Sequence, residues 1–364
     1  MIRVLHCIPT VLGGGAERQL SYLVAGLVAQ GHEVHLAHQQ EGPNFALVKR
    51  SGAHLHPLEA RHASDPRAAT DIARVLRDAR IEIVQTWLRR MDIWGGLAAR
   101  STGTPWVFSE RSQSVTIDER TASARTLRLL LPAARAVVAN SETAAELWRR
   151  GLHGRVPVRV VANALPTDRI ERVEPADRRE LGIPDGVPLA LYAGRFTEGK
   201  NVPLLGKALA RLMEHRPELH ALFLGEGPEL DDFRSWARAH GLHRRIVTPG
   251  YRDDLFRWMK AATLFVSPSR SEGRPNVVME AMACRCPMVL SDIAPHREFV
   301  GEDEAAWCRT DDLDALAAAL ERTLDDPEAA AERAARASAS VARFSIPAMV
   351  ASYEAVYREI LGHA

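Results

Sequence analysis

Residues 268–284 read Pro-Ser-Arg-Ser-Glu-Gly-Arg-Pro-Asn-Val-Val-Met-Glu-Ala-Met-Ala-Cys, and seven residues separate Glu272 from Glu280. The stretch follows an apolar strand predicted over residues 263–267 and opens a predicted helix. Pro275 suits the first turn of that helix, where its missing N–H removes no hydrogen bond. The glutamates are thus predicted to lie just before the helix and about one turn into it.

The start of this helix is predicted to present the N–H groups of Asn276 and Val277 to an anion. Two carboxylates beside such a helix end suit a nucleotide sugar, which carries hydroxyl groups as well as phosphates. The alternative is a surface loop with two solvated glutamates, because a bare pair of glutamates at this spacing also arises by chance.

The stretch resembles the E-x7-E signature of retaining glycosyltransferases of family 4, which have the GT-B fold. Other segments match that family in order: Gly-Gly-Gly-Ala-Glu-Arg at 13–18, Gly-Arg-Phe-Thr-Glu-Gly-Lys-Asn at 194–201, Gly-Glu-Gly-Pro at 225–228 and Gly-Tyr-Arg-Asp-Asp-Leu at 250–255. The resemblance runs nearly the full length and is more specific in the second half. It implies an α/β protein with two Rossmann-like domains facing a central cleft.

The chain length of 364 residues also favours two domains. Apolar strands alternate with helical patterns in both halves, which indicates parallel sheets covered by helices. The strands are predicted over residues 2–8, 33–37, 81–85, 106–109, 136–139 and 158–161, then 188–193, 219–224, 245–248, 263–267 and 288–290. The segment 164–187 lacks an apolar period and is interpreted as the crossing between domains.

Ser345 is predicted to cap a last helix, which in the family returns to the first domain. The expected domains are therefore an acceptor-binding domain, residues 1–166 with 346–364, and a nucleotide-sugar-binding domain, residues 167–345. Helices are also expected over residues 312–324 and 327–342.

The composition, 46% hydrophobic and 26% charged, is that of a soluble globular protein. No run of 18 apolar residues appears, and the first strand starts directly after Met1, so we expect no membrane span, no signal peptide and a cytoplasmic enzyme. The cysteines lack metal-ligand spacing and are expected to be small buried side chains: Cys7, Cys284, Cys286 and Cys308.

The net charge of +1 is unevenly divided. Residues 1–166 hold 21 Lys and Arg against 14 Asp and Glu, or +7, and the remainder holds 26 against 32, or −6. The first half is therefore expected to face something anionic. Nucleic acid is disfavoured, because no basic helix with interleaved aromatic residues and no nucleic-acid module is recognisable.

Arg195 and Lys200 flank a turn at the end of a predicted strand. Two cations there can neutralise a diphosphate leaving group, arginine as a bidentate fork and lysine as a point charge. The alternative is a surface turn with two solvated charges. With the family match, Arg195, Lys200 and Glu272 are predicted to be the catalytic residues.

The resemblance assigns Glu280 to the ribose hydroxyls and Glu272 to the transferred sugar. It places the base against Tyr251 and Arg252. The full set of predicted donor-binding residues is Gly14, Gly15, Gly194, Asn201, Glu226, Tyr251, Arg252, Gly273, Pro275, Asn276, Val277 and Glu280.

The first half departs from the family pattern where many relatives carry a histidine. Ser109-Glu110-Arg111 and Gln85-Thr86-Trp87 stand at those positions. A Ser-Glu-Arg variant is common in relatives of exopolysaccharide and lipid-linked oligosaccharide assembly, which favours a lipid-linked acceptor. The predicted acceptor contacts are Arg18, Glu110 and Arg111.

No metal ion or other cofactor is expected. Asp312-Leu313-Asp314 fits a D-x-D string, but it opens a helical stretch, so helix capping explains it. Histidines such as His32, His54 and His56 show no ligand spacing.

The predicted function is a retaining glycosyltransferase that moves a hexose from a nucleotide diphosphate, expected to be UDP, to a glycan or lipid-linked acceptor. The alternatives are a sugar-nucleotide epimerase of similar architecture, a non-catalytic nucleotide-sugar-binding protein and a Rossmann oxidoreductase. The oxidoreductase is disfavoured because the sequence lacks the Gly-x-Gly-x-x-Gly fingerprint of dinucleotide-binding folds, since position 18 is Arg.

A peripheral contact with the anionic inner face of a membrane is a further expectation. A segment rich in arginine and leucine in the first half could lie in a lipid interface, and its residues are Arg120, Arg125, Arg128, Arg135, Leu127, Leu129, Leu130 and Leu131. The alternative is that these leucines belong to the core and the arginines to a solvated face.

Overall fold

The computed structural model describes residues 1–12, 14–42, 44–59, 65–111, 121–272 and 274–362. It divides into two compact units, Met1–Ala164 with Phe344–Ala364 and Leu165–Arg343. Each boundary lies two residues before the one expected from the sequence.

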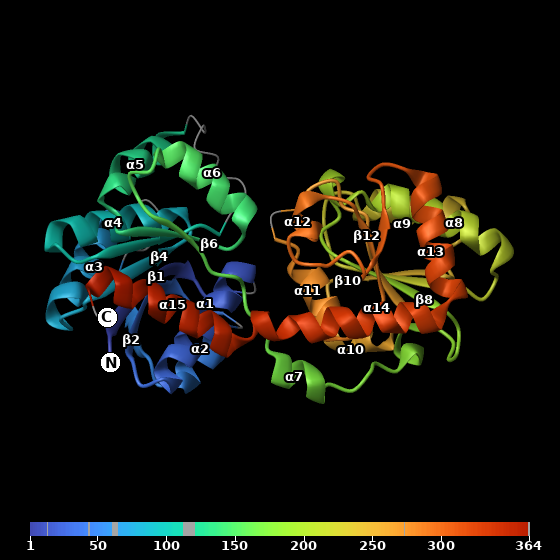
Figure 1. Cartoon of the computed structure of the whole chain (residues 1–364), viewed down its shortest axis with the longest axis horizontal. Coiled ribbons are helices and arrows are strands. Elements are labelled where there is room, and N and C mark those ends of the chain that lie inside the picture. The colour runs from blue at the N-terminus through green and yellow to red at the C-terminus, as the bar shows by residue number, and fades with distance from the viewer. Residues whose placement is uncertain (13, 43, 60–64, 112–120, 273, 363–364) are drawn as a thin grey trace. The chain divides into compact units, whose positions relative to one another are not determined.

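In the described residues, the first unit contains a parallel sheet of seven strands in the order β3-β2-β1-β4-β5-β6-β7. The strands are β1 (Arg3–Thr10), β2 (Glu33–Gln40), β3 (His54–Pro57), β4 (Ile83–Trp87), β5 (Trp106–Ser109), β6 (Ala136–Ala139) and β7 (Val158–Val160). The α-helices are α1 (Gly15–Ala29), α2 (Phe45–Ser51), α3 (Arg67–Asp78), α4 (Arg89–Thr102), α5 (Ala122–Leu130), α6 (Glu142–Leu152) and α15 (Ile346–Leu361) (Figure 1).

Two apolar cores lie on the opposite faces of this sheet. Helix α1 buries Leu20, Leu23 and Leu27, the helical period that the sequence predicts, in a core shared with α15. Helices α3, α4 and α6 bury their apolar faces in the second core. Each fully buried leucine contributes about 1.5–3 kcal/mol. Ser345 caps α15 as predicted, because its side chain accepts a hydrogen bond from the N–H of Ala348.

The described part of the second unit contains a six-stranded parallel sheet in the order β10-β9-β8-β11-β12-β13. The strands are β8 (Leu189–Ala193), β9 (His220–Leu224), β10 (Ile246–Gly250), β11 (Leu264–Ser267), β12 (Met288–Ser291) and β13 (Ala306–Cys308). The α-helices are α7 (Thr167–Arg172), α8 (Val202–His215), α9 (Leu230–Ala239), α10 (Leu255–Ala261), α11 (Asn276–Ala283), α12 (Ala294–Arg297), α13 (Leu313–Asp325) and α14 (Pro327–Ser340).

Two strands, β3 and β13, escaped the sequence analysis. Both are edge strands. β3 reads His-Leu-His-Pro and β13 has three residues, so neither forms an apolar run. The expected crossing segment also contains a helix, α7, which buries a single apolar residue, Ile170, and so shows no apolar period.

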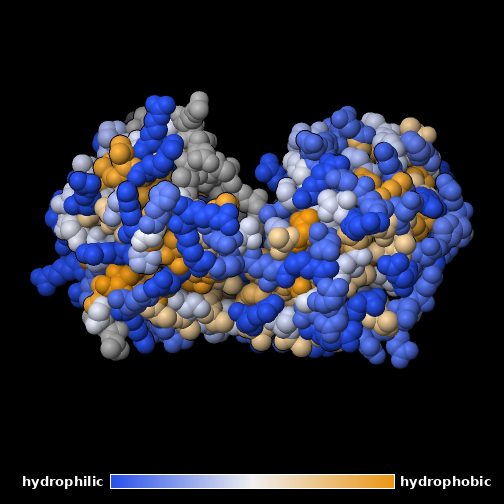
Figure 2. Space-filling model, turned by 45° about the horizontal axis from the view of Figure 1, so that its top comes forward, coloured by the Kyte–Doolittle hydropathy of each residue, from blue (hydrophilic) through white to orange (hydrophobic). Residues whose placement is uncertain are grey.

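The segment expected at a lipid interface is largely core. Leu127, Leu130 and Leu131 are buried, and Leu129 is 79% exposed. The arginines at 125, 128 and 135 are exposed, and Arg120 lies outside the described residues. Figure 2 shows a largely hydrophilic face with separate apolar patches. None of the helices in the described chain combines the length and apolar character that crossing a membrane requires.

Candidate active site

The loops after β8, β9 and β10 are joined by backbone hydrogen bonds in the second unit. The N–H of Gly194 donates to the Leu224 carbonyl, and the N–H of Gly225 donates to the Gly250 carbonyl, each at 2.9 Å. Glycine motifs that lie far apart in sequence therefore meet at the carboxyl end of the sheet, where open parallel sheets bind their ligands.

Two glycines in this region have no room for a side chain. Gly225 has φ of 135°, and a Cβ there would lie 1.9 Å from the Gly194 carbonyl oxygen. Gly227 has φ of 154°, and its Cβ would lie 2.3 Å from the Phe196 carbonyl oxygen. Only glycine allows this backbone approach. The Gly-Glu-Gly-Pro motif, which follows β9, therefore packs directly against the backbone of the loop that follows β8.

Lys200 and Glu272 form a two-pronged ion pair in the second unit. The Lys200 Nζ lies 2.5 Å from Oε1 and 2.6 Å from Oε2 of Glu272. The Ser269 hydroxyl donates to Oε1 at 2.7 Å. The side chains of Lys200 and Glu272 are 23% and 6% exposed, so the lysine is the partner that solvent and a ligand can reach.

The turn that carries Lys200 is tied to the loop that carries Glu272. The Arg270 N–H donates to the Gly199 carbonyl at 2.9 Å, and its guanidinium donates to Asp311 at 2.7 Å. Asp311 also accepts from the Asn201 amide at 3.1 Å. Asn201, predicted to contact the donor, is buried and has φ of 54°. In the structure its side-chain amide is engaged by Asp311.

Two side chains that the sequence did not predict, His296 and Tyr192, support the Lys200 turn and the Glu272 loop. Burial lowers the pKa of His296, so the ring is neutral and its Nδ1–H donates to the Ser291 carbonyl at 2.8 Å. Burial also raises the pKa of the Tyr192 phenol, with Glu272 as a further cause. Its hydroxyl donates to the Arg195 carbonyl at 2.9 Å. No sequence signal marked His296 or Asp311, whereas Ser269 and Arg270 lie inside the quoted stretch.

The start of α11 differs from the prediction. Pro275 precedes the helix as its N-cap, with φ of −79° and ψ of 69°, instead of lying in the first turn. The N–H of Asn276 donates to the Arg274 carbonyl at 2.9 Å and is therefore engaged. Glu280 lies one turn into the helix, as predicted, and is buried. Gly273 lies outside the described residues, and Val277 is half-buried.

The other predicted donor contacts of this unit differ in exposure. Arg195 and Glu226 have exposed side chains, and Tyr251 is 67% exposed. Arg252 is held by the Asp254 carboxylate at 2.7 Å and stacks over Trp258 with 5.4 Å to the ring centroid. An exposed ring and a fixed guanidinium thus lie next to one another in sequence.

The glycine loop of the first unit leads into α1. Gly14 is the N-cap and Gly15 the first residue of the helix, and both are exposed. A Cβ on Gly14 would lie 2.2 Å from Oε2 of Glu17, whose Oε1 accepts from the Thr10 hydroxyl at 3.2 Å. Arg18 follows in the first turn and is half-buried. Gly13 lies outside the described residues.

Glu110 and Arg111 serve the interior of the first unit. Glu110 is 4% exposed and accepts a hydrogen bond from the Trp148 indole at 2.7 Å. The Arg111 guanidinium donates to Asn163 at 2.7 Å and to the Tyr353 hydroxyl, and it lies 4.4 Å from the ring centroid of Trp87. These contacts fasten α15 to the sheet and leave Glu110 little exposure to a ligand.

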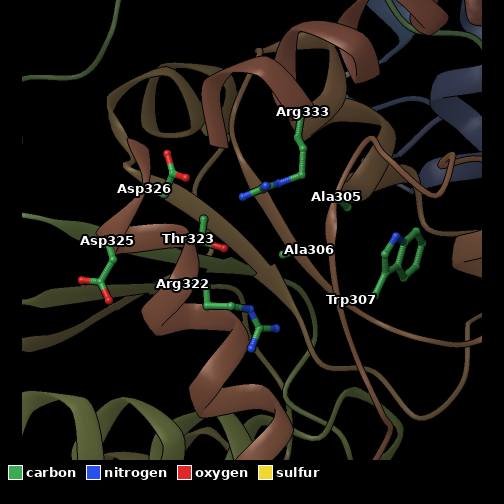
Figure 3. A pocket seen from close by; sticks show the side chains of 8 residues that line it. All are labelled: Ala305, Ala306, Trp307, Arg322, Thr323, Asp325, Asp326 and Arg333. Atoms are coloured by element: carbon green, nitrogen blue, oxygen red, sulfur yellow. The ribbon is translucent and has the colours of Figure 1, made fainter. Parts of the chain in front are cut away.

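A cavity of about 390 Å³ lies elsewhere in the second unit (Figure 3). It is lined by Ala305, Ala306, Trp307, Arg322, Thr323, Asp325, Asp326 and Arg333. These residues lie around the start of β13, around the end of α13 and in the first half of α14. The predicted donor residues instead follow the carboxyl ends of the strands, so this cavity is separate from the candidate site.

Two structural expectations are confirmed. The Asp312 carboxylate caps α13 by accepting from the N–H of Ala315 at 2.8 Å, so the D-x-D string has a capping role. All cysteines are buried and unpaired. Burial raises the pKa of the Cys284 thiol to about 12 and that of Cys308 to about 11, which keeps both thiols protonated and unreactive.

Family models match both halves of the chain. The model for glycosyl transferases group 1 matches residues 173–340, and the model for glycosyltransferase family 4 matches residues 13–169. Together they span nearly the whole chain, one in each compact unit.

Curated relatives are similar over part or most of the chain. The lipopolysaccharide core biosynthesis glycosyltransferase LpsE of Rhizobium meliloti is 29% identical over 208 residues, 57% of each chain. A UDP-Gal:alpha-D-GlcNAc-diphosphoundecaprenol alpha-1,3-galactosyltransferase of Escherichia coli is 23% identical over 350 residues, 89% of this chain and 88% of that protein. The chain spans 35% of the length of a putative teichuronic acid biosynthesis glycosyltransferase of Bacillus subtilis and 49% of that of an alpha-D-kanosaminyltransferase of Streptomyces kanamyceticus.

Solved structures show the same fold. Anabaena HepE in complex with UDP and glucose aligns with a TM-score of 0.84 at 19% identity, over 99% of this chain and 100% of that one. A sucrose-phosphate synthase from Thermosynechococcus elongatus aligns with a TM-score of 0.80 at 20% identity, over 100% of both chains. With two Rossmann-like parallel sheets and a family model matched in each half, the chain belongs to the family 4-type glycosyltransferases of the GT-B fold.

Proposed function

We propose that the chain is a retaining glycosyltransferase that moves a hexose from a UDP-sugar to a glycan or lipid-linked acceptor. The observation that carries the proposal is the Lys200–Glu272 pair at the carboxyl end of the second sheet. Support for the donor comes from HepE, whose structure holds UDP and glucose. Support for the acceptor comes from the Escherichia coli relative, which is named as a galactosyltransferase for alpha-D-GlcNAc-diphosphoundecaprenol.

In the proposed reaction, the donor diphosphate replaces Glu272 as the partner of Lys200. Negative charge grows on this leaving group as the bond to the sugar breaks, and a preorganised ammonium stabilises that charge. Arg195, exposed at the same turn, adds a bidentate guanidinium. Retention would follow from front-side displacement, with the leaving phosphate helping to deprotonate the acceptor hydroxyl. We assign no enzymic base and expect no requirement for an added divalent ion.

Glu272, released from the lysine, would face the transferred sugar and its developing positive charge. The buried Glu280 would accept hydrogen bonds from the ribose, and the exposed Tyr251 ring would lie against the base. Gly14 and Gly15, exposed at the N-terminus of α1, are the proposed donor contacts of the first unit. This assigns separate roles to the two glutamates of the motif.

Thermal-shift screening identifies the donor, because a ligand that binds only the folded state raises its apparent stability. We expect UDP and a UDP-sugar to raise the melting temperature more than GDP, ADP and their sugars. Mass spectrometry and NMR of the product then test transfer and the retained anomeric configuration. Release of nucleotide without an acceptor would support the epimerase instead, and binding without turnover would support a non-catalytic protein.

Calorimetric titration with the nucleotide distinguishes the proposed roles of Glu272 and Glu280. Glu272→Gln should leave nucleoside diphosphate affinity largely intact and cripple transfer. Glu280→Gln should weaken nucleotide affinity by about 10-fold, the effect of losing a hydrogen bond to a charged group. If the two variants behave the other way round, the assigned roles are reversed.

We also propose peripheral contact of the first unit with an anionic membrane or lipid diphosphate, supported by its +7 charge over residues 1–166. Arg125, Arg128 and Leu129 are exposed on α5. Each basic group near an anionic surface adds about 1 kcal/mol, and salt screens it. Co-sedimentation with anionic vesicles should fall with salt and in the double variant Arg125→Ser, Arg128→Ser. Equal binding to neutral vesicles would contradict the proposal.

A further inference from the structure

The two strands at one edge of the first sheet bring histidines together. Glu33 and His35 lie on β2, and His54 and His56 lie on β3. The parallel register pairs His35 with His54. Because side chains alternate between faces with a period of two, all four point to the same face of the sheet. Strand pairing therefore supplies the proximity that sequence spacing alone did not indicate.

His35 is the centre of this cluster. Its Nε2 lies 3.0 Å from Oε1 of Glu33, and its Nδ1 lies 2.9 Å from Nε2 of His56. Its ring stacks on His54 with centroids 4.7 Å apart. One ligand atom from each of Glu33, His35 and His54 lies within 4.8 Å of the others. A carboxylate oxygen and two imidazole nitrogens thus lie close together at this edge of the sheet.

The burial and charge of the cluster suit a metal ligand set. His35 is buried, Glu33 is half-buried and His54 is exposed. Imidazole nitrogens and a carboxylate oxygen are ligand types that divalent transition-metal ions bind.

We propose that Glu33, His35 and His54 bind a divalent transition-metal ion, and that His56 orients His35. Two imidazoles and a carboxylate suit zinc, with a fourth position for water. The Nδ1–H of His35 would donate to His56 while its Nε2 binds the metal, the usual outer contact of a metal-bound histidine. Tetrahedral zinc places ligand atoms about 3.3 Å apart, so the exposed His54 would turn inward.

The proposed metal site would stabilise the pairing of the edge strand β3 with β2. β3 pairs on one side only, with β2. Its exposed, half-polar sequence contributes little apolar burial, and open sheet edges need protection from wrong pairing. An ion coordinated from both strands would hold β3 in register. This role is independent of the proposed sugar transfer, which rests on residues of the second unit and the α1 loop.

Calorimetric titration of the full chain tests the site. After treatment with a chelator and dialysis at pH 7.5, the protein should bind one equivalent of Zn²⁺. His54→Gln and Glu33→Gln should each weaken zinc affinity at least about 10-fold. His56→Gln should weaken it about 10- to 100-fold without changing the stoichiometry, as loss of an outer contact does. Titration with Co²⁺ should give the visible absorption of a four-coordinate site.

The matched control is His243→Gln, which removes an exposed histidine of the second unit and should leave zinc affinity unchanged. Zinc should also raise the melting temperature of the wild type and of this control, but not of His54→Gln. His54 is exposed, so its variant tests the site even if replacement of His35 prevents folding. Failure of the wild type to bind zinc, or equal affinity in His54→Gln and His243→Gln, would overturn the proposal.

Discussion

Each unit contains a buried carboxyl side chain, but the two side chains differ in their partners. In the second unit, the Glu272 carboxylate is paired with Lys200 and accepts from Ser269. In the first unit, Asp92 is 3% exposed, and its Oδ1 has no hydrogen-bond partner within the part of the chain that the structure describes. Burial is the largest cause that raises the pKa of Asp92 to about 8, with nearby Glu110 adding to it.

The difference separates a candidate reaction centre from a scaffold. A carboxylate paired with a partly exposed lysine can exchange that partner for a ligand. A neutral carboxyl inside a core has no charge to offer. The nearby Glu110 and the adjacent residue in sequence, Arg111, are also engaged by interior partners. The motifs of the second unit thus converge on a reachable ion pair, whereas the family-like motif at residues 109–111 stabilises the fold of the first unit.

The largest expected effect is on turnover in the second unit. Lys200→Ala should lower turnover about 10²- to 10³-fold with donor in excess, the usual loss when one preorganised electrostatic group is removed. Lys207→Ala, which removes an exposed lysine from α8, is the matched control and should retain wild-type turnover. Near-normal rates in Lys200→Ala and Arg195→Ala together would remove the catalytic assignment from the ion pair.

A smaller effect, on stability, is expected in the first unit. Arg111→Met should lower the free energy of unfolding by about 1.5–3 kcal/mol, because guanidinium hydrogen bonds to Asn163 and Tyr353 are lost. Calorimetric melting checks this, with Arg125→Met, an exposed arginine of α5, as the control. A stable Arg111→Met protein with a raised KM for the acceptor alone would instead support the acceptor contact predicted from the sequence.

A pH dependence of stability is the third expected effect, and Asp92 introduces it. The folded protein holds this proton to a pKa of about 8, while the unfolded chain releases it near pH 4. Between these values the folded state binds more protons, so stability falls as pH rises, by at most about 1.4 kcal/mol per pH unit. Asp92→Asn should remove this slope in denaturant titrations at pH 5, 6.5 and 8. An unchanged slope in the variant would show that Asp92 is ionised in the folded protein.

The sequence by itself determined the architecture, and it predicted the residues of the candidate site in the second unit. Regular apolar strands and the helical period of α1 defined the parallel sheets, because burial on both faces leaves a local pattern. The short edge strands β3 and β13 left no such pattern. The glycines at 225 and 227 were recognised only as part of a family-like motif, and the structure shows the close backbone approach that requires them.

Only the tertiary structure decided which charges meet. Lys200 and Glu272 lie 72 residues apart, and the sequence assigned each to a ligand without indicating that they pair with one another. Likewise, His35 meets His54 only through strand register, and Arg111 meets Tyr353 only because α15 packs on the first sheet. Electrostatic partners depend on distance and burial in three dimensions, whereas apolar periodicity is local; the sequence therefore determined the fold more fully than the chemistry of its charged groups.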